Sequence, residues 1–305
     1  MTFGTIAGDN TVQNDKILGT FMGLAVGDAL GAPVEFRRRD SFPLITDMMA
    51  GGYFNLPAGA WTDDTAMALC LAESLFDHPD FDAADLIARL RAWLESGYNT
   101  STGKCVGVGQ NTFRTLMHCI RTGETLAIST GEKSDGNGAI MRLAPVACMY
   151  WNNLTEAMRI ADAQSRVTHY SELSAASSRY LAALLCHLIS GNSWKQALHD
   201  ASVGEWPEAF QPIINGDWRG KTREEIRSTG YVIDTLEAAL WSVHQCQSLE
   251  DTLITAVNLG DDTDSVGAVA GQIAGARYGY SGVPHRWLEP LIQKDHLLNI
   301  ARKFL

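Results

Sequence analysis

The chain has 305 residues, of which 46% are hydrophobic, so it is long and apolar enough to bury a large core. Its formal net charge of −11 excludes a general nucleic-acid-binding surface, because binding to phosphate backbones depends on clustered lysine and arginine. The six cysteines stand singly without a CxxC pair, which is typical of reduced thiols and favours a cytoplasmic protein over a disulfide-stabilised secreted one.

We expect neither export nor membrane insertion. Residues 1–16 lack the basic start and the apolar segment of a secretory signal, and we expect no stretch to reach membrane-spanning length. No long Pro/Ser-rich or charged linker divides the chain. The prediction is therefore one domain over residues 1–305, with residues 1–14 as a flexible N-terminal arm, while the oligomeric state stays open.

Apolar residues recur with a helical period through most of the chain, and convincing strand alternation is absent. The predicted helices cover residues 15–31, 64–76, 82–96, 110–121, 138–151, 154–165, 171–190, 193–201, 229–246, 249–258, 263–279 and 288–303. This order predicts an all-α fold, a compact orthogonal helical bundle. Rossmann and P-loop folds are excluded because they need strands.

The first helix and the second-last one each carry a stripe of glycines, spaced four residues apart. The stripes are Gly19, Gly23, Gly27 and Gly31, and Gly267, Gly271, Gly275 and Gly279. Glycine inside a helix costs about 1 kcal/mol relative to alanine, so such a row must gain from close packing of backbones. Asp28, Gln272 and Arg277 interrupt the apolar runs, which speaks against a membrane dimer face. We predict two buried core helices whose stripes allow them to pack on each other.

Two acidic clusters come directly before long helical patterns. Residues 61–65 read Trp-Thr-Asp-Asp-Thr, and residues 260–265 read Gly-Asp-Asp-Thr-Asp-Ser. Carboxylates and hydroxyls are hard oxygen donors, and a group of them favours Mg²⁺ or Mn²⁺ as countercharge. The alternative for each cluster alone is helix capping, since Thr and Asp are common at helix starts. Together the clusters predict a metal site divided between two distant segments.

A glycine-containing loop at residues 134–138 precedes the helix predicted from residue 138. Free N–H groups at a helix start suit phosphate oxygens, although an ordinary turn is the alternative. Combined with the acidic clusters, the loop favours a phosphorylated sugar substrate. His169, just before another helix, either lines a pocket or is a structural histidine. The histidines show no HExxH spacing, and no GxSxG motif or cysteine signature is present, so a hydrolytic function would depend on hard metals.

Five segments together resemble the ADP-ribosylglycohydrolase family. They are residues 27–35, 61–65, 136–142, 168–169 and 258–265, in the order typical of that family. The resemblance implies an all-α fold with two magnesium or manganese ions in a cleft. It also implies an enzyme that removes ADP-ribose from modified side chains or from small molecules.

The resemblance assigns roles to individual residues. The implied metal ligands are Thr62, Asp63, Asp64, Asp262, Asp264 and Ser265, and the implied catalytic groups are Glu35, Asp63 and Asp262. Glu35 would lie at the edge of the metal pair, as a general base or a movable ligand. The residues implied to bind the diphosphate and the distal ribose are Gly136, Asn137, Gly138 and Ala139, with His169 near the ligand.

The expected reaction is attack of water on the anomeric carbon of the ribose, with the cations holding the sugar hydroxyls. A guanidine leaves as a neutral group and needs no acid, which favours arginine over serine linkage. Hydrolysis of a small ADP-ribose adduct or a nucleotide, and non-catalytic ADP-ribose binding, are the alternatives. Three positions depart from the family pattern: residues 106–109 lack the acid that many bacterial members carry, Asp261 replaces a glycine and Ser265 a threonine.

Overall fold

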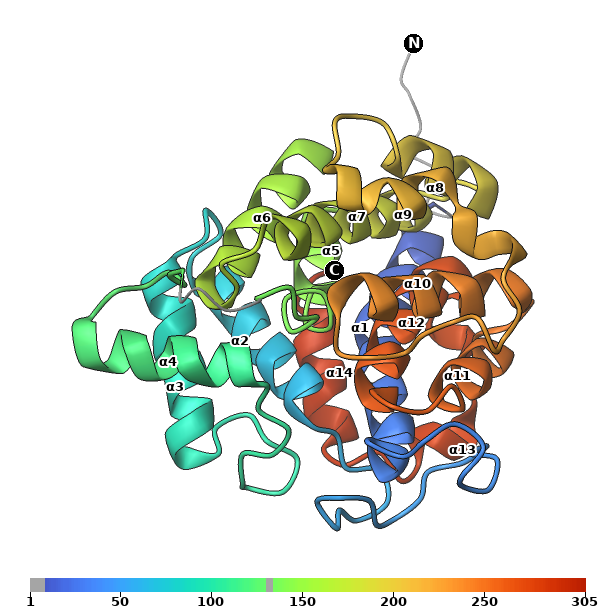
Figure 1. Cartoon of the computed structure of the whole chain (residues 1–305), viewed down its shortest axis with the longest axis horizontal. Helices are drawn as coiled ribbons and strands as arrows, with labels where there is room; N and C mark the ends of the chain where they lie inside the picture. The colour runs from blue at the N-terminus through green and yellow to red at the C-terminus, as the bar shows by residue number, and fades with distance from the viewer. Residues whose placement is uncertain (1–8, 130–133) are drawn as a thin grey trace.

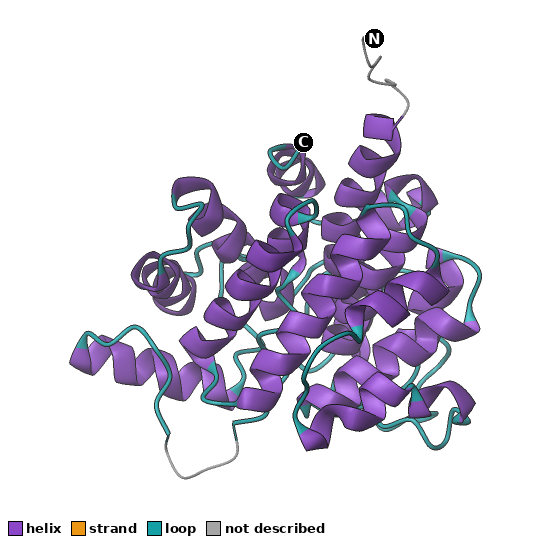
Figure 2. Ribbon diagram, turned by 90° about the horizontal axis from the view of Figure 1, so that it is seen from above, coloured by secondary structure: helices purple, strands orange, loops and turns teal. Residues whose placement is uncertain are grey.

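The computed structural model describes residues 9–129 and 134–305 of the chain. These residues form fourteen α-helices, joined by loops and short 3-10 turns, and no β-strand (Figures 1 and 2). The helices are α1 (Asp9–Gly31), α2 (Asp63–Asp77), α3 (Ala83–Ser96), α4 (Gln110–Thr122), α5 (Ala144–Tyr150), α6 (Leu154–Thr168), α7 (Glu172–Ile189), α8 (Trp194–Ala201), α9 (Gln211–Asn215), α10 (Val232–Gln245), α11 (Leu249–Val257), α12 (Thr263–Tyr278), α13 (His285–Leu288) and α14 (Lys294–Arg302). The predicted all-α fold is confirmed.

Three predicted segments differ from the observed helices. α1 begins at Asp9, so residues 9–14 of the predicted N-terminal arm are helical, while residues 1–8 lie outside the described part of the chain. The predicted helix over residues 138–151 is helical only in α5, because Pro145 begins a new helix after a series of turns. The predicted helix over residues 288–303 is divided at Pro290 into α13 and α14.

The two glycine stripes meet along the antiparallel pair α1 and α12, which lie side by side at the centre of the molecule (Figure 1). A Cβ atom added to Gly23 would lie 2.2 Å from the carbonyl oxygen of Gly271, and one added to Gly271 would lie 2.0 Å from that of Gly23. Only glycine permits backbones to approach so closely. The stripes therefore explain why this pair can form the middle of the core.

The segment from Thr11 to Val34 is long and apolar enough to cross a membrane, contrary to the expectation that no stretch would be. In the structure, 94% of its apolar window is buried inside the protein. One continuous apolar core surrounds this helix and includes residues from Ile17 to Ala301. The segment thus has the burial of a core helix.

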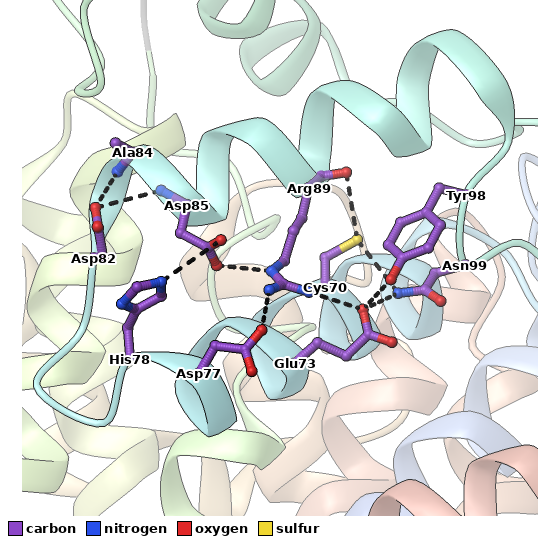
Figure 3. Close-up of polar contacts among 10 residues, drawn as sticks. All are labelled: Cys70, Glu73, Asp77, His78, Asp82, Ala84, Asp85, Arg89, Tyr98 and Asn99. Carbon is purple, nitrogen blue, oxygen red and sulfur yellow. Dashed lines mark hydrogen bonds and ion pairs between the residues drawn. The ribbon is translucent and has the colours of Figure 1, made fainter.

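A polar network joins α2 to α3 and to the loop after α3 (Figure 3). Arg89 on α3 donates to Asp85 over 2.7 Å and to Asp77 over 2.5 Å. Glu73 on α2 accepts hydrogen bonds from the Tyr98 hydroxyl at 2.7 Å and from the Asn99 amide at 2.9 Å. The start of the loop over residues 97–109 is therefore fixed to α2, whose N-terminus carries the first acidic cluster.

Candidate metal centre and active-site cavity

Three helix ends meet and bring the two acidic clusters together. The hydroxyl of Thr263, at the start of α12, donates to the carbonyl oxygen of Gly31, at the end of α1, over 2.8 Å. The backbone N–H of Thr62, directly before α2, donates to the Asp28 carboxylate of α1 over 2.9 Å. The residues gathered here are buried or partly buried: Glu35, Thr62, Asp63, Asp64, Asp262, Asp264 and Ser265.

The carboxylates form two groups that share one member. Oxygens of Asp28, Asp64 and Asp264 lie within 4.8 Å of one another. Oxygens of Glu35, Asp262 and Asp264 meet the same limit. Asp264 therefore stands between two potential cation positions, the arrangement that a pair of neighbouring ions requires.

Charge and hydrogen bonding of this cluster fit a divalent cation. Two buried oxygens, Oε2 of Glu35 and Oδ1 of Asp64, have no hydrogen-bond partner among the described residues. Burial, with the charge of Asp262 as a second cause, raises the pKa of Glu35 to about 8. The pKa of Asp64 is raised well above its ordinary value, first by burial and then by Asp28. A cation with hard-oxygen preference, such as Mg²⁺ or Mn²⁺, supplies the positive charge that these buried oxygens lack.

Helix capping does not account for the two clusters. Thr62 and Asp262 occupy the N-cap positions of α2 and α12, but neither side chain accepts a capping hydrogen bond from its own helix. The Asp262 carboxylate instead accepts a hydrogen bond from the Asn137 amide over 2.8 Å. Asp261 is exposed and lines the cavity, and among the described residues it belongs to neither carboxylate group. The side chains at these helix starts face one another and the cavity beside them.

Asp28 is the main residue of the site that the sequence analysis missed. Its buried carboxylate accepts hydrogen bonds from the N–H and the hydroxyl of Thr62 and from the N–H and the hydroxyl of Thr65. The orphan N–H groups of the first turn of α2 are thus satisfied by an acid from another helix. A buried acid inside a glycine-rich apolar helix was the available signal, and it was interpreted only as an interruption of that helix.

A short backbone bridge holds Glu35 beside the second cluster. The N–H of Phe36 donates to the carbonyl oxygen of Asp261 over 2.7 Å, and the N–H of Asp261 donates to the carbonyl oxygen of Arg37 over 2.8 Å. Phe36 and Asp261 both have left-handed backbone conformations, with φ of 64° and 61°. Such values are uncommon for residues other than glycine. The bridge therefore holds both segments, at Phe36 and at Asp261, in an unfavourable backbone conformation.

The predicted ligand loop lies against the acidic cluster, but it differs from the prediction in one respect. Residues 138–142 form turns and not the first turns of a helix, so the loop does not have the helix start that was expected to hold phosphate. Asn137 connects it to the site through its bond to Asp262, and Gly136 and Gly138 line the cavity. Ala139 is fully buried, and its side chain is not part of the cavity wall.

His169 faces this loop and is held by a relay of hydrogen bonds. A Cβ atom at Gly136 would lie 3.1 Å from its Nε2 atom. Arg142 donates to the Thr168 hydroxyl over 2.9 Å, and that hydroxyl lies 2.9 Å from Nδ1 of His169. Burial, reinforced by the Arg142 charge, lowers the pKa of His169 to about 3, so the ring is neutral. Nε2, the other ring nitrogen, faces the loop at Gly136.

A cavity of about 510 Å³ adjoins these groups, within the range of small-ligand sites. Its walls include the acids Glu35, Asp63, Asp261, Asp262 and Asp264, the loop residues Gly136, Asn137 and Gly138, and His169. Residues of the wall that the sequence analysis did not assign to the site include Phe36, Gly107, Asn111, Thr112, Met141, Thr229 and Gly230. They come from other loops and helix ends, and no single motif marks them.

The model of the ADP-ribosylglycohydrolase family matches residues 9–305. The chain belongs to the ADP-ribosylglycohydrolase family. It is 42% identical over 289 residues to the ADP-ribosylarginine hydrolase Tri1 of Serratia proteamaculans. The matched region covers 95% of this chain and 78% of that relative. It is 34% identical to the ADP-ribosyl-[dinitrogen reductase] glycohydrolase of Rhodospirillum rubrum, over 92% of each chain. A solved structure described as an ADP-ribosylglycohydrolase-related protein complex is similar with a TM-score of 0.85 and 36% identity, covering 96% of this chain and 98% of that one.

In this ADP-ribosylglycohydrolase, the segment over residues 106–109 has no acidic side chain, and the backbone of Gly107 lies at the cavity wall. Gly107 has a φ of +82°, and a Cβ atom there would lie 2.1 Å from Oδ1 of Asp63. Among the described residues, the Asp63 carboxylate belongs to neither group that could hold a cation, and it lines the cavity beside Gly107. The glycine thus leaves the space that the side chain of Asp63 occupies.

Proposed function

We propose that this protein hydrolyses the N-glycosidic bond between ADP-ribose and a modified arginine, releasing ADP-ribose, with two divalent cations of magnesium or manganese. The observation that carries the proposal is the pair of carboxylate groups sharing Asp264, next to a cavity walled by a glycine loop. Relatives at 42% and 40% identity, from Serratia proteamaculans and Pseudomonas putida, are named ADP-ribosylarginine hydrolases. The substrate is therefore an ADP-ribosylated protein or a small ADP-ribose adduct.

Bound cations would supply Lewis-acid polarisation of the ribose hydroxyls and of a water molecule. The residues that would hold them are Asp28, Asp64 and Asp264 on one side and Glu35, Asp262 and Asp264 on the other. Thr62 adds a hydroxyl 3.2 Å from Asp264, and Ser265 adds one at the cavity wall. Both clusters predicted from the sequence contribute to this donor set.

Different side chains of the cavity accept the proton, stabilise the charge on the sugar and orient the diphosphate. Glu35, kept ionised by the neighbouring cation, accepts the proton of the attacking water through the oxygen that does not bind that cation. As the bond from the anomeric carbon to nitrogen breaks, its electron pair stays on the guanidine, which leaves as a neutral group. The surrounding carboxylates stabilise the positive charge that develops on the sugar. His169, whose Nε2 atom faces Gly136, orients the diphosphate at the loop.

The test is release of intact ADP-ribose from ADP-ribosylarginine in the presence of Mg²⁺ or Mn²⁺. The wild type should release ADP-ribose with either or both ions, and a chelator should stop the reaction. Asp262→Ala should lose turnover, because Asp262 is a member of one carboxylate group and fixes Asn137. Liberation of inorganic phosphate without ADP-ribose would show a phosphohydrolase and overturn the proposal.

A further inference from the structure

Three aromatic side chains form a cluster on the loop between α1 and α2, close to the catalytic acids. The ring of Tyr53 meets Phe36 at 5.3 Å and Phe54 at 5.1 Å between centroids, both in edge-to-face geometry. Phe36 is 61% exposed and Tyr53 is 75% exposed. Large rings gathered at the surface keep apolar area in water, and such patches mark contact sites for partners or ligands.

These rings form one wall of a second cavity, of about 570 Å³. We call it the apolar groove and define it by Phe36, Tyr53, Phe54, Cys105, Val106, Gly107 and Val108. The groove adjoins the active-site cavity, because Phe36 and Gly107 line both. Within the described part of the chain, no charged side chain belongs to its walls, whereas the active-site wall carries several acids.

The groove and the ligand loop adjoin the active-site cavity through different residues. At the groove end, Gly107 lies against the Asp63 carboxylate, and Phe36 directly follows Glu35. At the loop end, the active-site cavity joins a polar cavity through Asn111, Gly136 and Gly230. If the diphosphate lies at the loop and the reacting ribose at the acids, as the proposed function requires, the leaving group departs beside the groove.

The conformation of Phe36 adds an independent observation. Its φ of 64° is unfavourable for a phenylalanine, and the backbone bonds to Asp261 maintain it. An exposed ring gains nothing for the core from such a conformation. Strain of this kind is found where a side chain must be presented in one direction for binding.

We propose that the apolar groove binds the polypeptide around the modified arginine, through aliphatic or aromatic side chains next to that arginine. This proposal rests on the proposed function and adds the class of substrate, a protein with apolar neighbours at the modification site. The arginine side chain alone reaches the acids, so a groove beside them is available to the residues that flank it. Aromatic walls suit such neighbours because apolar area is buried on both sides.

The test uses three substrates that differ only in the group to which the guanidine is attached. They are ADP-ribosylagmatine, a peptide with a single ADP-ribosylated arginine between leucine and tryptophan, and the same peptide with glycine and serine in those places. We expect kcat/KM of the wild type to be about five- to tenfold higher for the apolar peptide than for the glycine-serine peptide. Tyr53→Ala should reduce that ratio to about one, since it removes the most exposed ring of the groove.

Three controls make the result specific. Tyr53→Ala should hydrolyse ADP-ribosylagmatine as the wild type does, and Tyr53→Phe should retain the peptide preference because it keeps the ring. Leu44→Ala removes a side chain that is 68% exposed in the same loop but outside the groove, so it should change nothing. A thermal melt of each variant checks folding.

Two outcomes would overturn the proposal that the groove binds the polypeptide. One is a wild type with equal kcat/KM for both peptides, and the other is a Tyr53→Ala variant that loses kcat/KM equally on all three substrates. These differ from failure of the proposed function, in which the wild type releases ADP-ribose from none of them. That last result would remove both proposals at once, because the groove is argued from the position of the leaving group.

Discussion

The Asp28 carboxylate accepts two hydrogen bonds from Thr62, one from the backbone N–H and one from the hydroxyl, each at 2.9 Å. The same hydroxyl lies 3.2 Å from a carboxylate oxygen of Asp264 and 3.3 Å from one of Asp64. It therefore lies between Asp28 on α1 and these two acids. Asp28 thereby determines where α2 begins relative to α1, and with it the distance between the two acidic clusters.

We expect Asp28→Asn to weaken both the fold and the metal centre. The amide nitrogen would face hydrogen-bond donors, and each lost bond to a charged acceptor costs about 1.5 to 3 kcal/mol. The free energy of unfolding should fall by about 3 kcal/mol, measured in urea. Because Asp28 belongs to one of the two carboxylate groups, the affinity for Mn²⁺ should fall by more than about a hundredfold, measured by calorimetry. Unchanged Mn²⁺ affinity would show that Asp28 acts only in folding.

A matched pair separates the two effects of Asp28. Thr65→Val removes one hydroxyl that bonds to Asp28 at 2.6 Å, away from Asp64 and Asp264. It should cost about 1.5 kcal/mol of stability, the lower end for a bond to a charged acceptor, and leave turnover near the wild-type value. Thr62→Val removes a similar hydroxyl that also faces the acids, so it should reduce Mn²⁺ affinity as well.

Gly107→Ala should inactivate the enzyme while leaving it folded. The new methyl group would lie 2.1 Å from Oδ1 of Asp63, so the carboxylate must move. A displacement of about 1 Å in an active site can cost about a hundredfold in rate. The control is Gly103→Ala, which has a similar φ of +79° but no described neighbour within 4 Å of its Cβ atom. Both variants should lose about 1 to 2 kcal/mol of stability, and only Gly107→Ala should lose kcat/KM.

The helices could be predicted because the apolar period is a local pattern. The meeting of the acidic clusters could be predicted because each cluster is a short local motif rich in hard oxygen donors. Glycine spacing predicted the α1–α12 pair, and each cluster stands directly before its helix. Asp28 could not be assigned, since its partners Thr62 and Thr65 lie 34 and 37 residues away and no local pattern connects them. The predicted helix start at residue 138 was wrong because apolar residues continue through the turns before Pro145. Contacts between distant loops, such as Gly107 with Asp63, follow only from the assembled fold.

The metal centre makes a prediction about stoichiometry. Asp264 belongs to both carboxylate groups, whereas Asp262 belongs to one. Titration of the wild type with Mn²⁺ should show two sites, Asp262→Asn should weaken one of them, and Asp264→Asn should weaken both. Replacing a residue that only hydrogen-bonds to a ligand typically lowers metal affinity by about ten- to a hundredfold. Loss of a direct ligand should lower the affinity by more than that. Asp261→Asn, at an exposed acid outside both groups, should bind like the wild type, and equal effects at Asp262 and Asp264 would contradict a shared ligand.

His169 gives a prediction about pH. Burial lowers its pKa in the folded protein to about 3, from an ordinary value of 6.5. Between these values the unfolded chain binds a proton at this residue and the folded protein does not. Its contribution to stability is therefore complete above pH 6.5 and is lost as the pH falls from 6.5 towards 3.

Replacing His169 by Gln removes this titration, so the variant should be less sensitive to acid than the wild type. The difference in the free energy of unfolding between wild type and His169→Gln should shift by about 2 kcal/mol between about pH 7 and pH 5, to the disadvantage of the wild type. Urea denaturation of both proteins across this pH range measures it. Parallel pH curves would show that the fold does not lower the pKa of His169, which would contradict the burial of a neutral ring beside Arg142.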